Sequence, residues 1–222
     1  MISVIIPAYK ATRYIDECIL SIKGDCEILI GIDDCQDTYN HLKNHTYDNV
    51  QVFYFRRNVG PFTIKNTLVD CAKNDVILFF DSYDVMSEGT INLVETNIKN
   101  VDYLPLNYIN FTKKIVKSGH TMNDAVIAIK KDVFNSLNGF YPWKCGADTE
   151  FAYRLSYNYL KKGNLQGVCY YRRLHGENLT MRQETGHGSL IRKEYTNIIN
   201  RNIRANTWPS PKTKTIEDYV KD

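Results

Sequence analysis

The chain has 222 residues, of which 43% are hydrophobic and 24% charged, as in an ordinary globular domain with a sizeable core. Its 28 basic and 25 acidic residues leave a net charge of only +3, which argues against a nucleic-acid-binding protein. No apolar run reaches the roughly 20 residues that span a bilayer, and the first residues lack the features of a secretory signal. Six cysteines are spread singly, as expected of buried thiols in a reducing compartment. We therefore expect a cytoplasmic protein without a transmembrane segment.

The first part of the chain has the pattern of a strand, a helix and a second strand. Residues 3–7 form a short apolar run that ends at a proline, and residues 27–32 form another. Thr12 is placed to cap the helix between them. The apolar stripe of this helix consists of Ile15, Cys18, Ile19 and Ile22. A unit of this length predicts that its two strands are parallel.

The pattern then repeats. Residues 51–55 predict a third strand, and Pro61 stands where it favours the first position of a helix. The residues of this helix expected to face inward are Ile64, Leu68 and Cys71. The helix leads into residues 76–80, an apolar run typical of a strand buried on both faces of a parallel sheet. Successive strands thus end in polar turns at one edge of the sheet, where α/β proteins bind their ligands.

Two carboxylates, Asp81 and Asp84, follow the strand at 76–80 directly. Two acidic groups held close together repel each other unless a cation lies between them, and oxygen ligands suit Mg²⁺ or Mn²⁺. One interpretation is a corner that binds a metal ion and a nucleotide. The alternative is a polar turn, since Asp and Ser favour turns for local hydrogen bonding.

Less regular elements are expected beyond Asp84. The sequence predicts a half-exposed strand at 103–111 and a long helix at 148–162 that buries Phe151, Ala152, Leu155 and Tyr159. A hairpin or loop at 113–119 would present its basic residues to solvent. The other predicted elements are helices at 87–99, 132–137 and 190–204 and strands at 125–129 and 167–171.

Seven short motifs occur in an order that resembles one enzyme family. They are SVIIPAYK, IDDCQDT, RNVG with Lys65-Asn66, FFDSYD, NGF, GADTEF and YRRLHGENLT. Together they resemble the inverting nucleotide-sugar glycosyltransferases of family 2 over residues 2–180. The resemblance implies an α/β fold: a single GT-A (Rossmann-like) domain with a mostly parallel central sheet flanked by helices, and a small helical C-terminal extension.

The resemblance also divides the chain. Residues 1–180 would form the glycosyltransferase domain, with a nucleotide-sugar-binding half at 1–110 and an acceptor-binding half at 111–180. Residues 181–222 would form a basic, helical extension. The extension could lie on a membrane surface, pair with another subunit or close over the acceptor.

The resemblance assigns donor-binding residues in the first half. Pro7, Ala8 and Tyr9 would form the wall around the base and ribose, Asp34 would accept a hydrogen bond from the uracil N3–H, and Asp33 would shape that pocket. Lys65, Asn66, Asp81 and Ser82 would lie near the nucleotide. The alternatives are a polar turn for the aspartates and a solvated helix surface for Lys65.

A divalent Mn²⁺ or Mg²⁺ is the cofactor that the resemblance implies. Asp81 matches the first carboxylate of the family's D-x-D motif, but Tyr83 stands where the second is expected, and a phenol is a poor ligand at neutral pH. Asp84 could replace it. His175 is a further candidate ligand, against the alternative of a structural histidine, and His187 is a second choice. Arg172 and Arg173 could neutralise phosphate charge.

Asp148 matches the family's catalytic base, although Ala147 replaces an acid usually found in this motif. An inverting transfer needs a group that takes the proton of the attacking acceptor hydroxyl. The alternative is a helix N-cap. Trp143 and Glu150 would contact the acceptor, with a core or rim position as the alternative for the tryptophan.

The expected function is transfer of a sugar from a UDP-sugar, or another nucleotide-diphosphate sugar, to a hydroxyl of a glycan or other acceptor. Neither a nucleic acid nor a membrane-spanning segment is expected to take part. One alternative is a nucleotidyltransferase, but PAYKATR lacks the glycine-rich phosphate loop such enzymes need. Another is a catalytically silent sugar- or nucleotide-binding module, which Tyr83 and Ala147 keep open.

Overall fold

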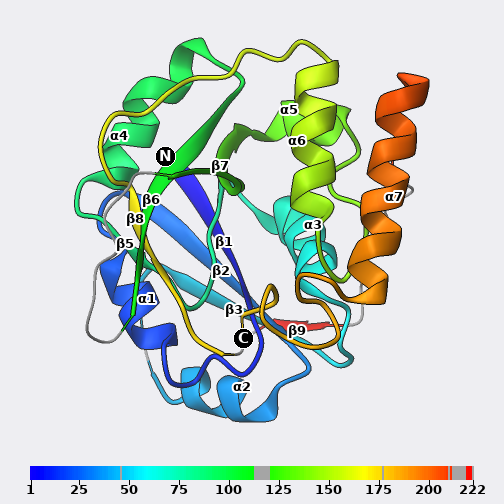
Figure 1. Ribbon diagram of the computed structural model, residues 1–222. Helices are drawn as coiled ribbons and strands as arrows, with labels where there is room; N and C mark the ends of the chain where they lie inside the picture. The colour runs from blue at the N-terminus through cyan, green and yellow to red at the C-terminus, as the bar shows by residue number, and fades with distance from the viewer. Residues whose placement is uncertain (46, 113–120, 177, 210, 212–218, 222) are drawn as a thin grey trace.

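The computed structural model describes residues 1–45, 47–112, 121–176, 178–209, 211 and 219–221. Within these residues, nine strands form one sheet with helices on both faces (Figure 1). The order of the strands across the sheet is β5-β8-β6-β7-β4-β1-β2-β3-β9. A mixed, mostly parallel central sheet flanked by helices is the arrangement that the resemblance implies.

The parallel part of the sheet comes from the first 80 residues. Strands β1 and β2 pair in parallel, β4 adds in parallel to β1, and β3 adds in parallel to β2. These strands are β1 (Ile2–Ala8), β2 (Cys26–Asp33), β3 (Val50–Phe55) and β4 (Val76–Phe79). Because the strands are parallel, their carboxyl ends meet at one edge, which is where the predicted site residues lie.

Two layers of helices cover the sheet (Figure 1). One hydrophobic cluster joins alternate residues of β1, such as Val4 and Ile6, to α1 (Ile15–Ser21), α2 (Gln36–Lys43) and α4 (Thr90–Asn97). The other joins Ile5 to α3 (Pro61–Cys71), α5 (Lys131–Ser136) and α6 (Ala147–Tyr157). Because successive side chains of a strand point to opposite faces of the sheet, each buried strand contributes residues to both layers.

Close packing of α3 on β2 depends on Gly31. A Cβ added at this glycine would lie 2.2 Å from Cγ2 of Ile64 on α3. That distance is far below van der Waals contact, so only glycine lets the helix approach the strand this closely.

The second half of the sheet is mixed. Strand β4 pairs antiparallel with β7 (Thr121–Lys130), β7 pairs antiparallel with β6 (Tyr103–Phe111), and β6 pairs in parallel with β8 (Tyr170–Arg173). The edge strand is β5 (Val85–Met86), and a short 3₁₀ helix, η1 (Ile98–Asn100), precedes β6. The prediction of a purely parallel environment for residues 76–80 is therefore wrong on one side of β4, although the strand is buried on both faces.

Several local predictions were wrong where tertiary contacts intervene. Helix α1 begins at Ile15, so its N-cap position is Tyr14 rather than Thr12, and no side chain caps it. The Thr12 hydroxyl lies 3.3 Å from that of Thr38. The first four residues of β6 are buried, so this strand is not half-exposed there. Helix α6 ends at Tyr157, and Tyr159, which adopts a left-handed backbone conformation, is 96% exposed rather than buried. The loop expected at 113–119 lies outside the described residues.

The C-terminal segment contributes one helix and one strand. Helix α7 (Leu190–Ala205) lies close to the predicted bounds, and the side chain of Ser189, the residue before it, caps its first turn. Strand β9 (Tyr219–Lys221), which the sequence did not predict, pairs antiparallel with β3. Among the described residues, none of the helices combines the length and the apolar character needed to cross a bilayer.

Candidate functional site

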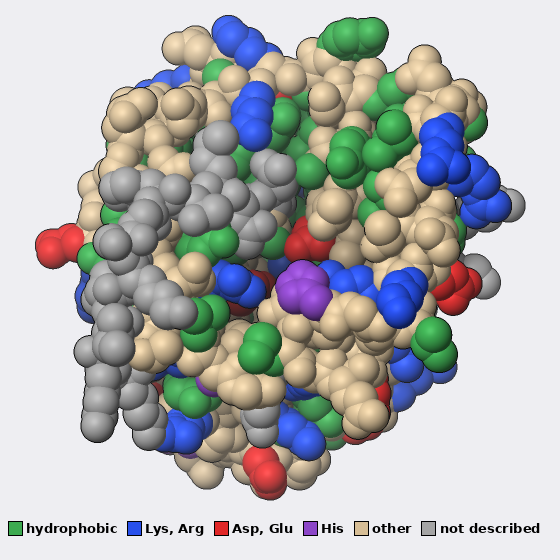
Figure 2. Space-filling model, viewed as in Figure 1, with side chains coloured by type: hydrophobic (Ala, Val, Ile, Leu, Met, Phe, Trp, Pro, Cys, Tyr) green, Lys and Arg blue, Asp and Glu red, His purple; other side chains and the backbone are tan. Residues whose placement is uncertain are grey.

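A cavity of about 500 Å³ opens at the carboxyl ends of β1, β2 and β4. Figure 2 shows acidic, basic and histidine side chains around a hollow in the middle of this face. Most of the residues predicted for donor binding and catalysis line it: Pro7, Ala8, Tyr9, Asp33, Lys65, Asp81, Ser82, Asp84 and Asp148. A cleft of this size at the carboxyl edge of an α/β sheet suits a ligand as large as a nucleotide.

Asp33, the last residue of β2, is buried in the wall of this cavity. Its carboxylate accepts hydrogen bonds from the backbone N–H groups of Val59, at 2.7 Å, and Gly60, at 3.1 Å. Asp34, by contrast, is exposed, does not line the cavity and accepts a 3.4 Å hydrogen bond from the Tyr54 hydroxyl. The structure therefore places the first carboxylate of the pair, not the second, at the cavity.

Burial raises the pKa of Asp33 from 3.8 to about 6, against the opposing effect of the two N–H groups. A raised carboxyl pKa means that the folded state holds this proton more tightly than the unfolded state does. The contribution of Asp33 to stability is therefore full below pH 3.8 and declines as the pH rises to about 6.

We expect the Asp33→Asn variant to gain stability relative to wild type as the pH rises. The difference in unfolding free energy between the two should shift by about 2 kcal/mol between about pH 4 and about pH 7. Urea unfolding of both proteins at each pH measures this difference. A difference that stays constant with pH would mean that Asp33 titrates normally in the folded protein.

The turn after β4 holds the two carboxylates predicted to bind a cation. The N–H of Asp84 donates to the Asp81 carbonyl oxygen at 3.1 Å, and the Asp84 carboxylate accepts the Arg173 N–H at 2.9 Å. Burial and the negative charge of Asp81 raise the pKa of Asp84 well above the usual range of an aspartate. Tyr83, between them, donates its hydroxyl to the Tyr9 carbonyl oxygen.

These residues fit a divalent cation. Both carboxylates line the cavity, Asp84 is only 3% exposed, and their mutual repulsion is part of what raises the pKa of Asp84. A cation between them would relieve that repulsion, and carboxylate oxygen is the ligand that Mg²⁺ and Mn²⁺ prefer. Tyr83 does not take part, because its hydroxyl is used within the chain.

Lys65 supplies a buried positive charge to the lining of the cavity. It is 3% exposed on α3, and its Nζ lies 3.5 Å from Oδ1 of Asp81. The solvated-surface alternative for this lysine is therefore wrong. Its charge also opposes the rise in the pKa of Asp148, and a cation in this position could balance the charge of a bound anion.

Asp148 lies in the first turn of α6, after Gly146, whose positive φ of 76° begins the helix. Its Oδ1 accepts the N–H of Thr149 at 2.9 Å, and part of its surface remains exposed. Burial raises the pKa of this carboxyl, an effect that the charge of Lys65 opposes. Asp148 is thus a carboxylate at the cavity with more basic character than a surface aspartate.

Three arginines complete the cavity, and two of them were not predicted. Arg172 lies on β8, and its positive charge opposes the rise in the pKa of Asp84. Arg182 lies with its guanidinium 5.5 Å from the centre of the Tyr9 ring, and Arg192 is held by a 2.7 Å hydrogen bond to the Thr185 carbonyl oxygen. Both come from the C-terminal segment, where the basic composition was the only signal in the sequence.

Of the two histidine candidates, the second choice lines the cavity and the first does not. The ring of His175 packs against those of Tyr83 and Tyr14, with centroids 4.4 and 5.4 Å apart, and it does not line the cavity. His187, the second choice, does line it. The guanidinium of Arg173 likewise has partners within the chain, since it donates hydrogen bonds to the Tyr83 carbonyl oxygen and to the Glu17 carboxylate.

Three other predicted residues lie outside the cavity lining. The side chain of Asn66 exchanges two 2.9 Å hydrogen bonds with the backbone of Phe140. Glu150 is completely buried and paired with Arg154 at 2.7 Å, so the expectation that it meets the acceptor is wrong. Trp143 stacks on Tyr195 of α7, with centroids 4.4 Å apart, so its stacking partner is part of the chain itself.

Solved structures of S. aureus TarS resemble this chain. TarS 1-349 in complex with UDP-GlcNAc matches with a TM-score of 0.69 and 19% sequence identity, over 80% of this chain and 59% of that one. Its complex with UDP matches with a TM-score of 0.64 and 19% identity, over 79% and 61%. A further structure, described as S. aureus TarS without a residue range, matches with a TM-score of 0.66 and 18% identity, over 91% of this chain and 39% of that one.

This likeness establishes the GT-A fold, and the chain spans less than two thirds of the TarS structures it matches. No curated protein is similar enough to count as a match. The sequence model described as glycosyl transferase family 2 matches residues 3–199, most of the chain. The chain therefore belongs to glycosyl transferase family 2.

Proposed function

We propose that this chain transfers a sugar from a UDP-sugar, or another nucleotide-diphosphate sugar, to an acceptor hydroxyl with inversion at the anomeric carbon. One observation carries the proposal: a single cavity is lined by the Pro7–Tyr9 wall, two adjacent carboxylates, several cationic side chains and Asp148. Uridine is the preferred nucleoside because the similar TarS structures contain UDP or UDP-GlcNAc.

The donor would lie with its base against Pro7, Ala8 and Tyr9. We move the contact with the uracil N3–H from Asp34 to Asp33, because Asp33 lines the cavity and Asp34 does not. Its carboxylate has oxygen lone pairs beyond those used by the backbone N–H groups.

The diphosphate would lie near Asp81, Asp84 and the basic side chains. A divalent cation held by the two aspartates would neutralise charge that develops on the departing diphosphate. Lys65 and Arg172 add positive charge that is already in place before the reaction, and preorganised charge of this kind stabilises the transition state most. His187 replaces His175 as the histidine best placed to take part, because it lines the cavity.

Asp148 would act as the general base. As the acceptor oxygen forms its bond to the anomeric carbon, the bond from that carbon to the diphosphate oxygen breaks, and the hydroxyl proton passes to Asp148. The diphosphate leaves with the bonding electron pair. Its raised pKa makes Asp148 a stronger base than an exposed aspartate, provided that it is ionised in the resting enzyme.

Binding of UDP is expected to raise the melting temperature of the wild-type protein in the presence of Mn²⁺ and much less in excess chelator. A ligand at about 100 times its Kd stabilises the folded state by about 2.7 kcal/mol. Asp84→Asn should remove most of the metal-dependent part of the shift. The variant should fold, because an asparagine oxygen can still accept the Arg173 N–H and no buried charge remains.

Glu88→Gln is the matched control. Glu88 is an exposed acid shortly after Asp84 in the chain, and it does not line the cavity. This variant should shift with UDP and Mn²⁺ as wild type does. An absent UDP shift in wild type under both conditions would overturn the uridine assignment. A normal shift without any transfer from a panel of UDP-sugars would favour the catalytically silent module.

The cytoplasm is our proposed location. All six cysteines are free thiols, and five of them are buried, whereas Cys71 is partly exposed. Free thiols suit a reducing compartment. The acceptor is proposed to be a glycan or another hydroxyl compound, because the reaction requires an attacking oxygen.

A further inference from the structure

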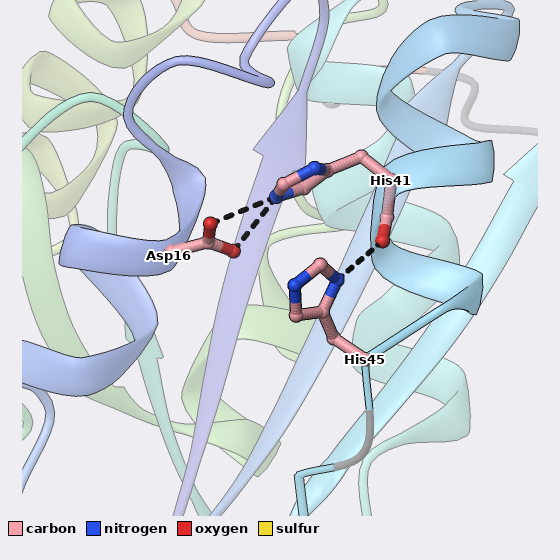
Figure 3. A group of neighbouring side chains, drawn as sticks. All are labelled: Asp16, His41 and His45. Atoms are coloured by element: carbon pink, nitrogen blue, oxygen red, sulfur yellow. Dashed lines mark hydrogen bonds and ion pairs between the residues drawn. The ribbon is translucent and has the colours of Figure 1, made fainter.

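A second group of metal-ligating side chains lies away from the cavity, where α1 approaches the end of α2 (Figure 3). Asp16 belongs to the first turn of α1, His41 to the last turn of α2, and His45 to the segment that follows α2. One ligand atom from each lies within 4.8 Å of the other two. None of the three residues lines the cavity, so this group is separate from the proposed transferase site.

Hydrogen bonds within the chain already orient these ligands. The Nδ1–H of His45 donates to the His41 carbonyl oxygen at 2.7 Å, so its Nε2 keeps the lone pair that a metal ion needs. In Figure 3 this second nitrogen lies on the side of the His45 ring that faces Asp16. The Tyr47 hydroxyl donates to Oδ1 of Asp16 at 2.9 Å. Metal-binding histidines and carboxylates are typically held by such bonds to a carbonyl or a hydroxyl.

The distances suit a small transition-metal ion. Nε2 of His41 lies 2.8 Å from Oδ2 and 2.9 Å from Oδ1 of Asp16. In a tetrahedral zinc site with bonds of about 2.0–2.1 Å, neighbouring ligand atoms are about 3.3 Å apart. Small side-chain rotations would open the His41–Asp16 pair and bring His45 in to that spacing. The metal would replace the proton between His41 and Asp16, and this proton would pass to solvent.

We propose that Asp16, His41 and His45 bind one Zn²⁺ ion, or a divalent ion of similar preference, with water at the fourth position. Two imidazoles and one carboxylate form a donor set that favours zinc over Mg²⁺, which prefers oxygen ligands alone. His45 is exposed and the other two are half-buried, so the ion can enter from solvent. The bound ion would tie α1 to the end of α2 and stabilise the half of the sheet that holds the proposed nucleotide site.

Without an ion, the same atoms form a hydrogen-bonded His41–Asp16 pair. The two states differ in His45, which this pair does not need and a metal site does. A test on His45 therefore separates them, and because this ring is exposed its removal should leave the fold intact.

The test is calorimetric titration of Zn²⁺ into metal-free protein, with Mg²⁺ in excess to occupy the carboxylates of the cavity. We expect one ion per wild-type chain and a higher melting temperature in its presence. Tyr47→Phe should weaken binding about tenfold, since it removes only an orienting bond. His45→Ala should weaken it further or abolish it. Asn44→Ala, an exposed neighbour of His45, should bind as wild type does.

Visible absorption of the Co²⁺-substituted protein gives a second readout, because four-coordinate Co²⁺ absorbs strongly and six-coordinate Co²⁺ weakly. Strong absorption that is lost in His45→Ala supports the proposal. Wild type without saturable one-to-one zinc binding would overturn it. So would zinc binding that survives in His45→Ala but is lost in Asp81→Asn, because the ion would then lie in the cavity.

Discussion

The Asp148→Asn variant is expected to lower the turnover number for sugar transfer by about a thousandfold, the usual contribution of a general base. UDP binding should change little, because the substitution removes a base and leaves the nucleotide wall intact. Asparagine can still accept the Thr149 N–H that Asp148 accepts at 2.9 Å, so the start of α6 should be preserved. UDP release from a panel of UDP-sugars, with and without candidate acceptors, measures the rate.

Asp132→Asn is a close control for this variant. Asp132 lies in the first turn of α5 and accepts the N–H of Val133 at 2.8 Å, which is the same local geometry, but it does not line the cavity. It should transfer sugar as wild type does. Full activity in Asp148→Asn would show that another group takes the proton and that Asp148 serves only the start of the helix.

The Arg154→Met variant is expected to lose about 3–5 kcal/mol of unfolding free energy, the usual result of removing one partner of a buried ion pair. Arg154 is 1% exposed and Glu150 is completely buried. The guanidinium donates to both carboxylate oxygens of Glu150, at 2.7 and 2.8 Å, and to the carbonyl oxygens of Leu137 and Gly139, at 2.5 and 2.6 Å. Its removal leaves a buried carboxylate and two buried carbonyl groups without these donors.

The loss in Arg154→Met should depend on pH. Burial raises the pKa of Glu150, and the hydrogen bond and charge of Arg154 oppose this rise. Without Arg154 the folded-state pKa rises further, so the variant should lose stability as the pH increases through the usual range of a glutamate and beyond. Urea unfolding at acidic and neutral pH should therefore give a smaller deficit at the acidic value.

Two further variants test whether the loss of stability in Arg154→Met comes from the broken ion pair. Arg201→Met, on the exposed surface of α7, should change stability little. The double variant Arg154→Met with Glu150→Leu should recover part of the loss, because the unpaired charge is gone. A single variant as stable as wild type would mean that the pair contributes nothing beyond what an apolar side chain supplies.

The central part of the fold could be predicted because its signals are local. Continuous apolar runs at 3–7, 27–32 and 76–80 mark strands buried on both faces, and their βαβ spacing leaves parallel pairing as the ordinary solution. Parallel strands bring their carboxyl ends to one edge, so Asp33, Asp81 and Pro7 near the end of β1 had to lie near each other. The part of the candidate site formed by the ends of these strands followed from this arrangement.

Helix α2 and strand β9 escaped prediction for a different reason. Of the residues in α2, only Thr38 and Leu42 are buried, and three residues of β9 are too few to form a pattern. Both elements exist because of what they pack against. The ring of Tyr219, for example, lies 5.6 Å from that of Phe53 on the sheet.

The sequence by itself determined the parallel pairing of the first strands, the edge at which their carboxyl ends meet and the family resemblance, because periodicity and motif order are properties of neighbouring residues. Only the tertiary structure decided which acids face the cavity. Asp148 and Glu150 are two positions apart on α6, yet helix geometry turns one toward the cavity and the other into the core beside Arg154. Arg182 and Arg192 likewise reach the cavity only through the path of the C-terminal segment, which depends on contacts between residues far apart in the chain.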